Sequence, residues 1–374
     1  MERRQHFCRF LRLSLLNFGI IWLCISAAVA SLEAATSATL AQIIEGAKKE
    51  GTIRGLWSQN AFGGSEGFAD FVAGMNKRYG LNLKGQFTPG PDMQAIMLRI
   101  AQEAAAGQPA SSDVYMGNAQ AIFDGLKAQV LKPVDWAAIL DRRPPTEPGF
   151  DPLAADGTHV AIASTVVGIQ YNTNLVKGAD IPKRLEDVLN PKWKGRIAST
   201  PYAAGMRELA MPGFLGREYI VEFTKKLSKQ IGGLIRCGEA ERLTSGEFVM
   251  LVLTCGGQDA IVLQRSGAPL AQTVVQEGTV LHMRYAAVPK NSRSPNAAAL
   301  FAAYLLTREG QALLWKHDGL DLHLFPESQM KKDVETVRAA GGKVAVNTPQ
   351  WLGSLKGYSE TQKELEKILR EGGK

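Results

Sequence analysis

Apolar residues recur along this chain at two alternating spacings. In residues 68–79 and 93–104 they return every three or four positions, which predicts amphipathic helices that bury one face. Between such stretches lie short apolar runs, and residues 52–58 and 113–116 are typical of strands. Strands that alternate with helices of this length favour parallel sheets with right-handed crossovers, so the pattern predicts an α/β fold.

Two longer β-rich segments, residues 159–172 and 280–289, interrupt this rhythm. They indicate a chain that leaves a first lobe, builds a second lobe and then returns. The predicted division gives residues 31–165 to lobe 1, residues 166–284 to lobe 2, and residues 285–374 to the return into lobe 1 and the C-terminal helices. The last helix is expected to pack on lobe 1. The alternative is that both segments are ordinary core strands of a single domain.

The first thirty residues have the pattern of a signal peptide. A basic start precedes an apolar run over residues 13–29, and Ala28-Val29-Ala30 supplies the small residues of a cleavage site. We therefore predict export to the periplasm, with cleavage near Ala30 or alternatively after Ala35. The other interpretation is a membrane anchor, for which the run is barely long enough. Cys24 lacks the small-residue context of a lipidated cysteine.

Charge and cysteine content limit the classes of function. The chain carries a net charge of +7, and removal of residues 1–30 leaves about +4. The positive charges are scattered without a basic arm, so no nucleic-acid partner is expected. The mature chain is longer than one hydrophobic core usually holds, which again favours two lobes. Its two cysteines, Cys237 and Cys255, either form a disulfide after export or remain buried free thiols.

Four short motifs resemble one known family. In chain order they are Tyr171-Asn172-Thr173-Asn174-Leu175-Val176, Leu189-Asn190-Pro191-Lys192-Trp193-Lys194-Gly195-Arg196-Ile197, Ser245-Gly246-Glu247, and a helical stretch from Pro295 to Leu314. Together they resemble bacterial extracellular solute-binding proteins of the ferric-iron, polyamine and phosphonate type. The order and spacing of the motifs are similar over about residues 50–320, and each motif alone is weakly specific.

The resemblance implies a bilobal, type II-like periplasmic-binding-protein fold in which two crossover strands join two α/β lobes. The hinge is expected near Thr165–Gly168 and Tyr285–Val288, with the ligand between the lobes. The implied function is the substrate-binding component of an ABC importer that delivers a small ligand to a membrane permease. We expect a monomer without enzymatic activity, cofactor or metal. A receptor that docks on a membrane sensor kinase would have the same fold.

Ligands of open α/β sheets bind beyond the carboxyl ends of the strands, and four predicted loops qualify. The first, residues 58–65, is rich in glycine, and Ser65 is expected to cap the following helix. The loops at residues 117–120, 199–205 and 254–259 are the others. The ligand-binding candidates are Asn60, Ser65, Asn118, Thr200 and Tyr202, with Arg284 near the hinge as a weaker choice. For each loop residue the alternative is an ordinary turn or cap.

The candidate loops bear on the class of ligand. The resembled ferric-binding proteins use adjacent tyrosines, whereas Tyr202 and Tyr219 stand alone here. Polyamine binding requires several carboxylates, and Asp259 is the only acid in the four loops. Amide, hydroxyl and backbone N–H donors are plentiful, and arginines bind carboxylate and phosphoryl groups well. We therefore predict an organic anion, such as a carboxylate, phosphonate or sugar phosphate, with ferric iron or a polyamine as the alternative.

One motif suggests catalysis instead. Gly63-Gly64-Ser65-Glu66-Gly67 matches the G-x-S-x-G pattern of a nucleophile elbow, which would make the chain an exported serine hydrolase using Ser65. The motif follows the first predicted strand rather than a later one, and no His-Gly-Gly loop precedes it. His317 and His323 with the aspartates between them fit no standard zinc spacing, so no metal site is predicted.

Overall fold

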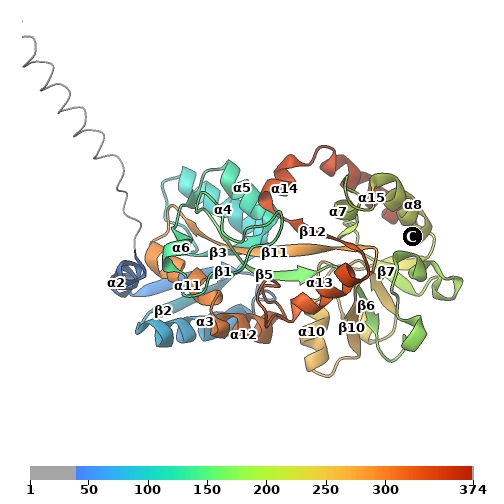
Figure 1. Cartoon of the computed structure of the whole chain (residues 1–374), viewed down its shortest axis with the longest axis horizontal. Helices are drawn as coiled ribbons and strands as arrows, with labels where there is room; N and C mark the ends of the chain where they lie inside the picture. The colour runs from blue at the N-terminus through green and yellow to red at the C-terminus, as the bar shows by residue number, and fades with distance from the viewer. Residues whose placement is uncertain (1–38, 373–374) are drawn as a thin grey trace, which may run out of the picture. The chain divides into compact units, whose positions relative to one another are not determined.

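The computed structural model describes residues 39–372. The predicted signal peptide and its cleavage site at Ala30 lie outside this range. From Leu40 onward the chain forms one compact unit. It contains two five-stranded sheets with helices packed against them, which is an α/β arrangement of two lobes (Figure 1).

The sheet of the first lobe is built around its longest strand, β11 (Gly278–Pro289). One edge of β11 pairs with β5 (Val160–Val166), and the other pairs first with β12 (Lys343–Asn347) and then with β3 (Tyr115–Asn118). The short β4 (Leu131–Lys132) continues at its end. A parallel pair of β1 (Thr52–Trp57) and β2 (Lys84–Pro89) joins through a bridge between Gly55 and Val114.

Helices of the first lobe bury apolar faces on these strands, as the spacing of apolar residues predicts. The stretches 68–79 and 93–104 lie in α3 and α4, and residues 52–58 correspond to β1, which confirms these predictions. Trp57 is fully buried, with Phe62 and Phe68 edge-on to its ring. The helices are α2 (Leu40–Glu50), α3 (Gly64–Tyr79), α4 (Met93–Ala105), α5 (Ala119–Lys127), α6 (Trp136–Ile139), α11 (Pro295–Leu305), α12 (Arg308–Asp318) and α13 (Met330–Ala339).

The second lobe has a smaller mixed sheet with its own apolar core. Its strand order is β10 (Leu270–Thr273), β6 (Ile169–Asn172), β9 (Met250–Val252), β7 (Ile197–Ser199) and β8 (Ile231–Leu234). β7 is parallel to β8 and β9, whereas β6 is antiparallel to β9 and β10. The helices are α7 (Met206–Leu209), α8 (Arg217–Ser228), α9 (Glu241–Thr244) and α10 (Gln258–Arg265), with 3₁₀ turns at Gly178–Asp180, Leu185–Leu189 and Pro191–Trp193.

Two segments cross between the lobes side by side. The first is Val167-Gly168, between β5 and β6, and it lies in the predicted hinge segment Thr165–Gly168. The second runs from the end of β10 into the start of β11. The two are joined because the Val167 N–H donates to the carbonyl of Val280, and the Thr279 hydroxyl donates to the carbonyl of Val167.

The predicted second hinge, Tyr285–Val288, is wrong, as is a lobe boundary between residues 284 and 285. Both positions fall inside β11, where Tyr285 pairs with Gly117 of β3 and with Ala161 of β5. A strand paired on both edges cannot supply the hinge. The sequence pattern marks β11 as a β-segment but does not show which part of it pairs with the first sheet.

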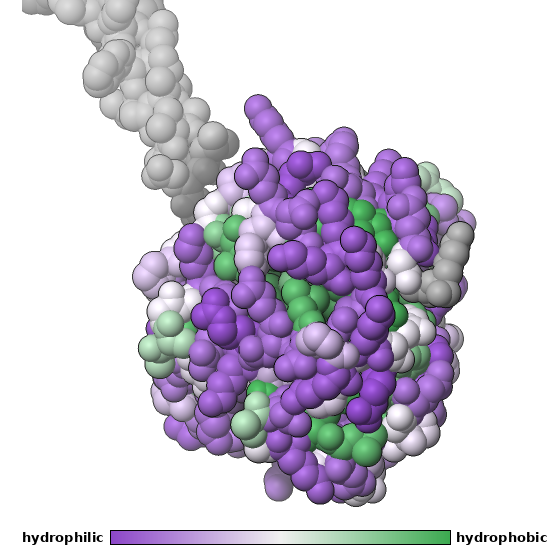
Figure 2. All heavy atoms as spheres, turned by 90° about the vertical axis from the view of Figure 1, so that its right-hand side faces the viewer, coloured by the Kyte–Doolittle hydropathy of each residue, from purple (hydrophilic) through white to green (hydrophobic). Residues whose placement is uncertain are grey.

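The C-terminal segment crosses between the lobes a third time. After β12, α14 (Pro349–Ser354) packs against α5 of the first lobe, and α15 (Tyr358–Gly372) packs against α8 of the second. The prediction that the last helix packs on lobe 1 is wrong, because Leu365 and Leu369 are fully buried in the apolar core of lobe 2. Figure 2 shows the end of the molecule that includes α8 as mainly hydrophilic, with hydrophobic residues in separate small areas.

Candidate ligand-binding cavity

The pairing of β11 leaves a short uncovered stretch on one edge. β3 ends at Asn118, opposite Arg284, and β12 ends at Asn347, opposite His282. Met283 lies between these two pairs. Paired residues point to the same face of a sheet, as do residues two apart on one strand. The side chains of Asn118, Arg284, His282 and Asn347 therefore share one face, at the place where two strands end.

A cavity of about 290 Å³ lies at this place, between elements of the two lobes. The first lobe contributes α4, α5 and β11, and the second lobe contributes the segment leading into α7 and the loop after β9. Two arginines, one histidine and four side-chain amides line it, and no carboxylate does. The lining residues are Gln94, Asn118, Ala119, Gln120, Tyr202, Ala204, Gly205, Arg207, Cys255, His282, Met283, Arg284, Asn347 and Leu352.

On the first-lobe side, the N-terminus of α5 faces the cavity. Asn118 caps this helix because its Oδ1 accepts the Ala121 N–H at 3.0 Å. Ala119 and Gln120, the first two residues of the helix, line the cavity directly. The partial positive charge at a helix N-terminus favours an anion nearby.

On the second-lobe side, a tight turn after β7 presents Tyr202 and Gly205. The turn is held by Thr200, whose fully buried hydroxyl accepts the Ala204 N–H at 2.9 Å. Gly205 has φ of 71°, and a Cβ there would lie 2.5 Å from Val167 Cγ1 in the first crossing segment. Only glycine fits this position, which brings the wall of the cavity against the hinge.

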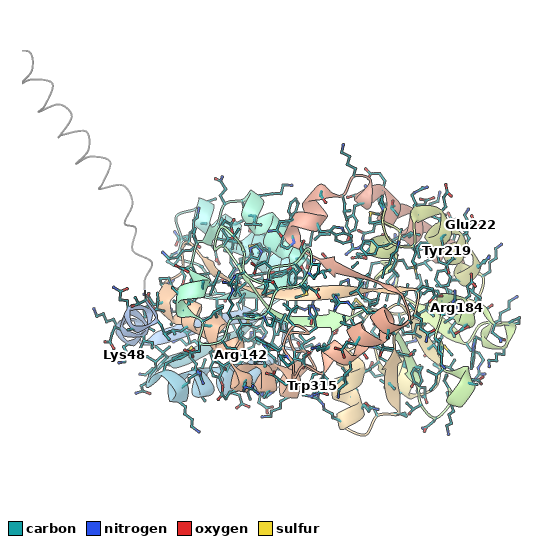
Figure 3. The ribbon with its side chains drawn as sticks, viewed as in Figure 1. Lys48, Arg142, Arg184, Tyr219, Glu222 and Trp315 are labelled. Atoms are coloured by element: carbon teal, nitrogen blue, oxygen red, sulfur yellow. A yellow bond between two sulfur atoms is a disulfide. The ribbon has the colours of Figure 1, made fainter. Side chains whose placement is uncertain are left out.

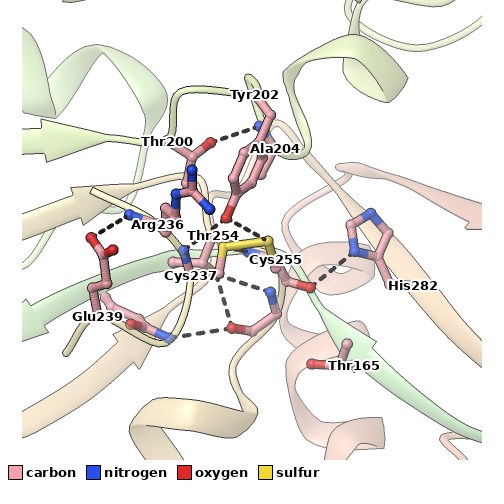
Figure 4. Close-up of a disulfide and its surroundings, with 12 residues drawn as sticks. Thr165, Thr200, Tyr202, Ala204, Arg236, Cys237, Glu239, Thr254, Cys255 and His282 are labelled. Atoms are coloured by element: carbon pink, nitrogen blue, oxygen red, sulfur yellow. Dashed lines mark hydrogen bonds between the residues drawn. A yellow bond between two sulfur atoms is a disulfide. The ribbon is translucent and has the colours of Figure 1, made fainter. Parts of the chain in front are cut away.

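A disulfide between Cys237 and Cys255 supports the same wall (Figure 4). The Cys237 N–H donates to the Tyr202 hydroxyl at 2.8 Å, and the carbonyl of Cys255 accepts a hydrogen bond from His282 Nδ1 at 3.0 Å. The disulfide therefore connects the loop after β8 with the loop after β9 and orients two lining side chains. It lies at the cavity rather than on a remote surface.

Arg207 belongs to a buried network. Its Nε donates to Glu208 Oε1 at 3.0 Å, and the same oxygen accepts the Tyr358 hydroxyl at 3.1 Å. His282 Nε2 lies 3.6 Å from it. Burial of Glu208 raises its pKa, but Arg207 and His282 outweigh this and lower the pKa to about 2. Glu208 is fully buried, so its charge is neutralised by groups of the protein itself.

Arg284 is the contrasting cation of the cavity. It is buried to 9% exposure and lines the cavity, yet no hydrogen bond or ion pair reaches its guanidinium among residues 39–372. Burial lowers its pKa, whereas the negative charges of Asp318 and Asp259 act in the opposite direction. Burial also raises the pKa of Asp318, to about 7, and that of Asp259. Neither carboxylate contacts Arg284 within ion-pair distance or lines the cavity.

The structure brings together three of the six predicted ligand-binding residues. Asn118, Tyr202 and Arg284 line the cavity, whereas Asn60, Ser65 and Thr200 do not. Asn60 and Ser65 are both exposed, Asn60 on the loop before α3 and Ser65 in the first turn of that helix. Ser65 is not the expected cap: Gly63 is the N-cap of α3, and the Ser65 hydroxyl accepts a hydrogen bond from Gln59 Nε2 at 3.2 Å. Gly63, Gly64 and Ser65 are all residue types common in turns and caps, so the sequence did not show at which of them the helix begins.

Several lining residues were not predicted. Gln94 lies in the first turn of α4. The amphipathic pattern of this helix predicts which face is buried, but not that its first turn borders a cavity. Asn347 and Leu352 belong to the third crossing, for which the sequence offered only a short alternating stretch before a Thr-Pro pair. His282 precedes Arg284 by two positions on β11. Because residues two apart on a strand point to the same face, its spacing from Arg284 could have predicted that His282 lines the cavity.

None of the four histidines of the described residues forms a hydrogen bond with Ser65, whose hydroxyl accepts one from Gln59. His317 Nε2 lies 2.8 Å from Asp70 Oδ2, His323 contacts Ser164 and Glu147, and His159 contacts Thr158. Ser65 therefore has no histidine base in this structure, which removes the support for a serine hydrolase site there.

Glu66, Asp70 and His317 place one potential metal-binding atom each within 4.8 Å. The Asp70 oxygen that meets His317 also accepts a hydrogen bond from Lys316 Nζ at 2.8 Å. The carboxylate oxygen that a metal would need is therefore already paired with a lysine cation.

A larger and more open hollow, of about 670 Å³, lies on lobe 2 among the 3₁₀ turns. Its charged residues bind other parts of the same region: Lys192 Nζ donates to Asp180, and Asp187 accepts the backbone N–H groups of Lys183 and Arg184. None of its side chains is an unpaired buried cation. The smaller cavity between the lobes is therefore the stronger candidate site.

The chain belongs to the family of bacterial extracellular solute-binding proteins, since residues 113–340 match that family. Among curated relatives, an uncharacterised protein of Haemophilus influenzae is 26% identical over 174 residues, which cover 44% of this chain and 50% of that protein. The Fe(3+)-binding periplasmic protein of Serratia marcescens is 29% identical over 112 residues, covering 30% of each. The matched stretches thus span half or less of these relatives.

Solved structures share the fold at low identity. The substrate-binding protein of an ABC transporter from Agrobacterium tumefaciens superposes with a TM-score of 0.67 at 16% identity, covering 91% of this chain and 96% of that one. An iron- and citrate-bound IdiA (FutA) protein of Trichodesmium superposes with a TM-score of 0.60 at 17% identity, covering 86% of this chain and 99% of that one. The spermidine/putrescine transporter protein PotD of Streptococcus pneumoniae superposes with a TM-score of 0.62 at 16% identity, covering 85% of this chain and 99% of that one. This likeness confirms a bilobal periplasmic-binding-protein fold.

Within residues 39–372, no helix combines the length and apolar character that a membrane span requires.

Proposed function

We propose that this protein is the periplasmic substrate-binding component of an ABC importer and that its cavity captures a small organic anion. The observation that supports the anion is the composition of the lining. Two arginines and a histidine face the cavity without a lining carboxylate, and Arg284 has no partner among the described residues. A buried arginine without a counter-ion is costly, and a carboxylate or phosphoryl group would satisfy it with paired hydrogen bonds.

Ferric iron and polyamines fit the lining less well. Tyr202 is the one lining tyrosine, and Tyr219 lies on α8 near the edge of the molecule (Figure 3). Carboxylates, which a polyamine needs, are absent from the lining: the charges of Asp259 and Asp318 act on Arg284, but neither side chain lines the cavity. The proteins with iron or polyamine in their names share the fold with this chain at 16–17% identity. At that distance the ligand follows from the site rather than from the fold.

The proposed mechanism is binding without chemistry. We assign residues 40–166, and those from β11 to α13, to lobe 1, and residues 169–273 to lobe 2. A ligand that contacts Asn118 and Arg284 from lobe 1 and Tyr202 from lobe 2 would stabilise the closed arrangement. The permease would recognise that state. The proposal includes export with cleavage near Ala30, action as a monomer, and a disulfide formed in the periplasm.

A thermal-shift screen of the mature protein tests this function. The panel contains citrate, succinate, glycerol 3-phosphate, glucose 6-phosphate, phosphonoacetate, spermidine and ferric citrate. A ligand at a hundred times its Kd adds about 2.7 kcal/mol of stability and raises Tm. We expect shifts with one or more organic anions and none with spermidine. A shift with spermidine alone, or one with ferric citrate that citrate does not reproduce, would overturn the anion proposal.

A further inference from the structure

Asn347 presents an unpartnered hydrogen-bond acceptor at the cavity. It is the last residue of β12, lines the cavity and is 8% exposed. Its Nδ2 lies 3.5 Å from Glu208 Oε1. A carboxylate at that position only accepts hydrogen bonds, so the amide nitrogen has to face Glu208 and the oxygen has to face elsewhere. Within residues 39–372, no donor reaches Asn347 Oδ1.

The neighbouring donors face other groups, although His282 Nε2 has no hydrogen-bond partner among residues 39–372. Arg207 donates through Nε to Glu208 and through Nη1 to Gln362 at 2.6 Å. His282 donates through Nδ1 to the carbonyl of Cys255, and its Nε2 faces Glu208. Buried acceptors in native proteins are nearly always satisfied, because an unmet one costs the desolvation of the group. Asn347 lines the cavity, so a molecule bound there could supply the donor.

We propose that the ligand carries two recognition groups: an anionic group that binds Arg284, and a hydroxyl or ammonium donor that binds Asn347 Oδ1. This inference rests on the proposed anion-binding function and deepens it. Asn347 is opposite His282, whose backbone position is about 7 Å along β11 from that of Arg284, so the two groups bind neighbouring positions of one sheet face. Hydroxy acids, phosphorylated polyols and amino acids carry both groups. Simple carboxylates and alkyl phosphates carry only the first.

The acceptor for the second recognition group, Asn347, lies outside the part of the chain that matches the family. That match ends at residue 340, whereas Asn347 lies on the third crossing. The carboxylate that orients its amide, Glu208, is held in turn by Tyr358 of α15. The C-terminal segment thus orients an acceptor over the cavity, in addition to linking the lobes. It is the segment that distinguishes a hydroxylated or aminated anion from its plain analogue.

Calorimetric titration with matched ligands tests the inference. The probes are glycerol 3-phosphate against propyl phosphate, and 4-hydroxybutyrate and 4-aminobutyrate against butyrate. We expect the wild-type mature protein to bind the donor-bearing member of at least one pair tenfold or more tightly than the plain member. The 4-hydroxybutyrate and 4-aminobutyrate arms distinguish a hydroxyl from an ammonium donor. Equal affinity within every pair overturns the inference and leaves the anion proposal standing.

Two variants separate recognition from folding. N347A removes the acceptor, whereas T348A removes the cap of α14, whose hydroxyl accepts the Trp351 N–H at 3.0 Å, and leaves the acceptor in place. We expect N347A to abolish the preference and retain the affinity for the plain anion, and T348A to keep the preference. A preference that persists in N347A overturns the inference. If no probe binds at millimolar concentration, the anion proposal itself fails, and the inference fails with it.

Discussion

Two arginines line the same cavity, but only one of them has a carboxylate partner within the protein. Arg207 donates to the fully buried carboxylate of Glu208 at 3.0 Å, with Tyr358 on the same oxygen. Arg284, at 9% exposure, has neither a hydrogen bond nor an ion pair among the described residues. The charge of Arg207 therefore belongs to the fold, and that of Arg284 is available to a ligand. Burial alone does not make an arginine a binding residue; the absence of a partner does.

The largest expected effect comes from breaking the satisfied pair. E208A leaves Arg207 without its carboxylate in a buried setting, so we expect the free energy of unfolding to fall by roughly 3–5 kcal/mol. Urea denaturation at pH 7.5 measures this. Glu222, whose pair with Lys225 is exposed on α8, offers the matched control E222A, for which no measurable change is expected. Equal stability of E208A and wild type would remove the distinction between the two arginines.

The same carboxylate predicts a pH dependence. The pKa of Glu208 is about 2 in the fold against an ordinary value of 4.5. A lowered carboxyl pKa contributes stability that is present above the unfolded-state value and lost as pH falls through the folded-state value. We expect the wild type to lose about 3 kcal/mol more than E208Q between pH 5 and pH 2. Parallel pH profiles of the two proteins would contradict the assignment of the low pKa to Glu208.

The disulfide holds the wall opposite Arg284. It closes a loop with a sequence separation of 18, so its loss in C237A/C255A is expected to cost about 3 kcal/mol of unfolding free energy. Because Tyr202 accepts the Cys237 N–H, the variant should also expose backbone amides around residues 200–205. Hydrogen exchange detects that change. Unaltered protection of this turn would show that Thr200, through its bond to Ala204, suffices to hold it.

The smallest effect on stability is expected at Arg284, with the opposite sign. Replacing an unpaired buried charge by an apolar side chain of similar length removes a desolvation cost, so R284M should raise the free energy of unfolding by about 1 kcal/mol. R207M is the counterpart and should lower it, because Glu208 would lose its partner. Urea denaturation of both variants without ligand gives the comparison. Destabilisation by R284M would show that its guanidinium has a structural partner.

Much of the fold was predictable from periodicity. The helices at residues 68–79 and 93–104 and the strand at 52–58 follow from their apolar spacing, and the motifs from Tyr171 to Leu314 indicated the family. The position of α15 was not predictable, because an amphipathic helix shows that one face is buried but not which lobe buries it. The prediction of the second hinge was wrong for a similar reason. The sequence of β11 has the same β-type pattern along its length, and the strands that pair with it are far away in sequence.

The site was predictable where loops follow strands, and not elsewhere. Asn118 ends β3 and Tyr202 follows β7, and both line the cavity, as expected for the carboxyl ends of strands. Ser65 also comes after a strand, but it lies in the first turn of α3, where its exposed side chain accepts a hydrogen bond from Gln59. Asn347 could not be found from sequence alone, since its role depends on β12 ending opposite His282 and on Glu208 orienting its amide.

The central claim is that Arg284 binds an anion, and one titration tests it most directly. Calorimetry compares the wild type, R284M and S65A with the anion that gives the largest thermal shift in the screen. The account predicts that R284M loses at least a hundredfold in affinity while S65A binds like the wild type, because Ser65 lies outside the cavity. Wild-type affinity in R284M, or a loss confined to S65A, would contradict it.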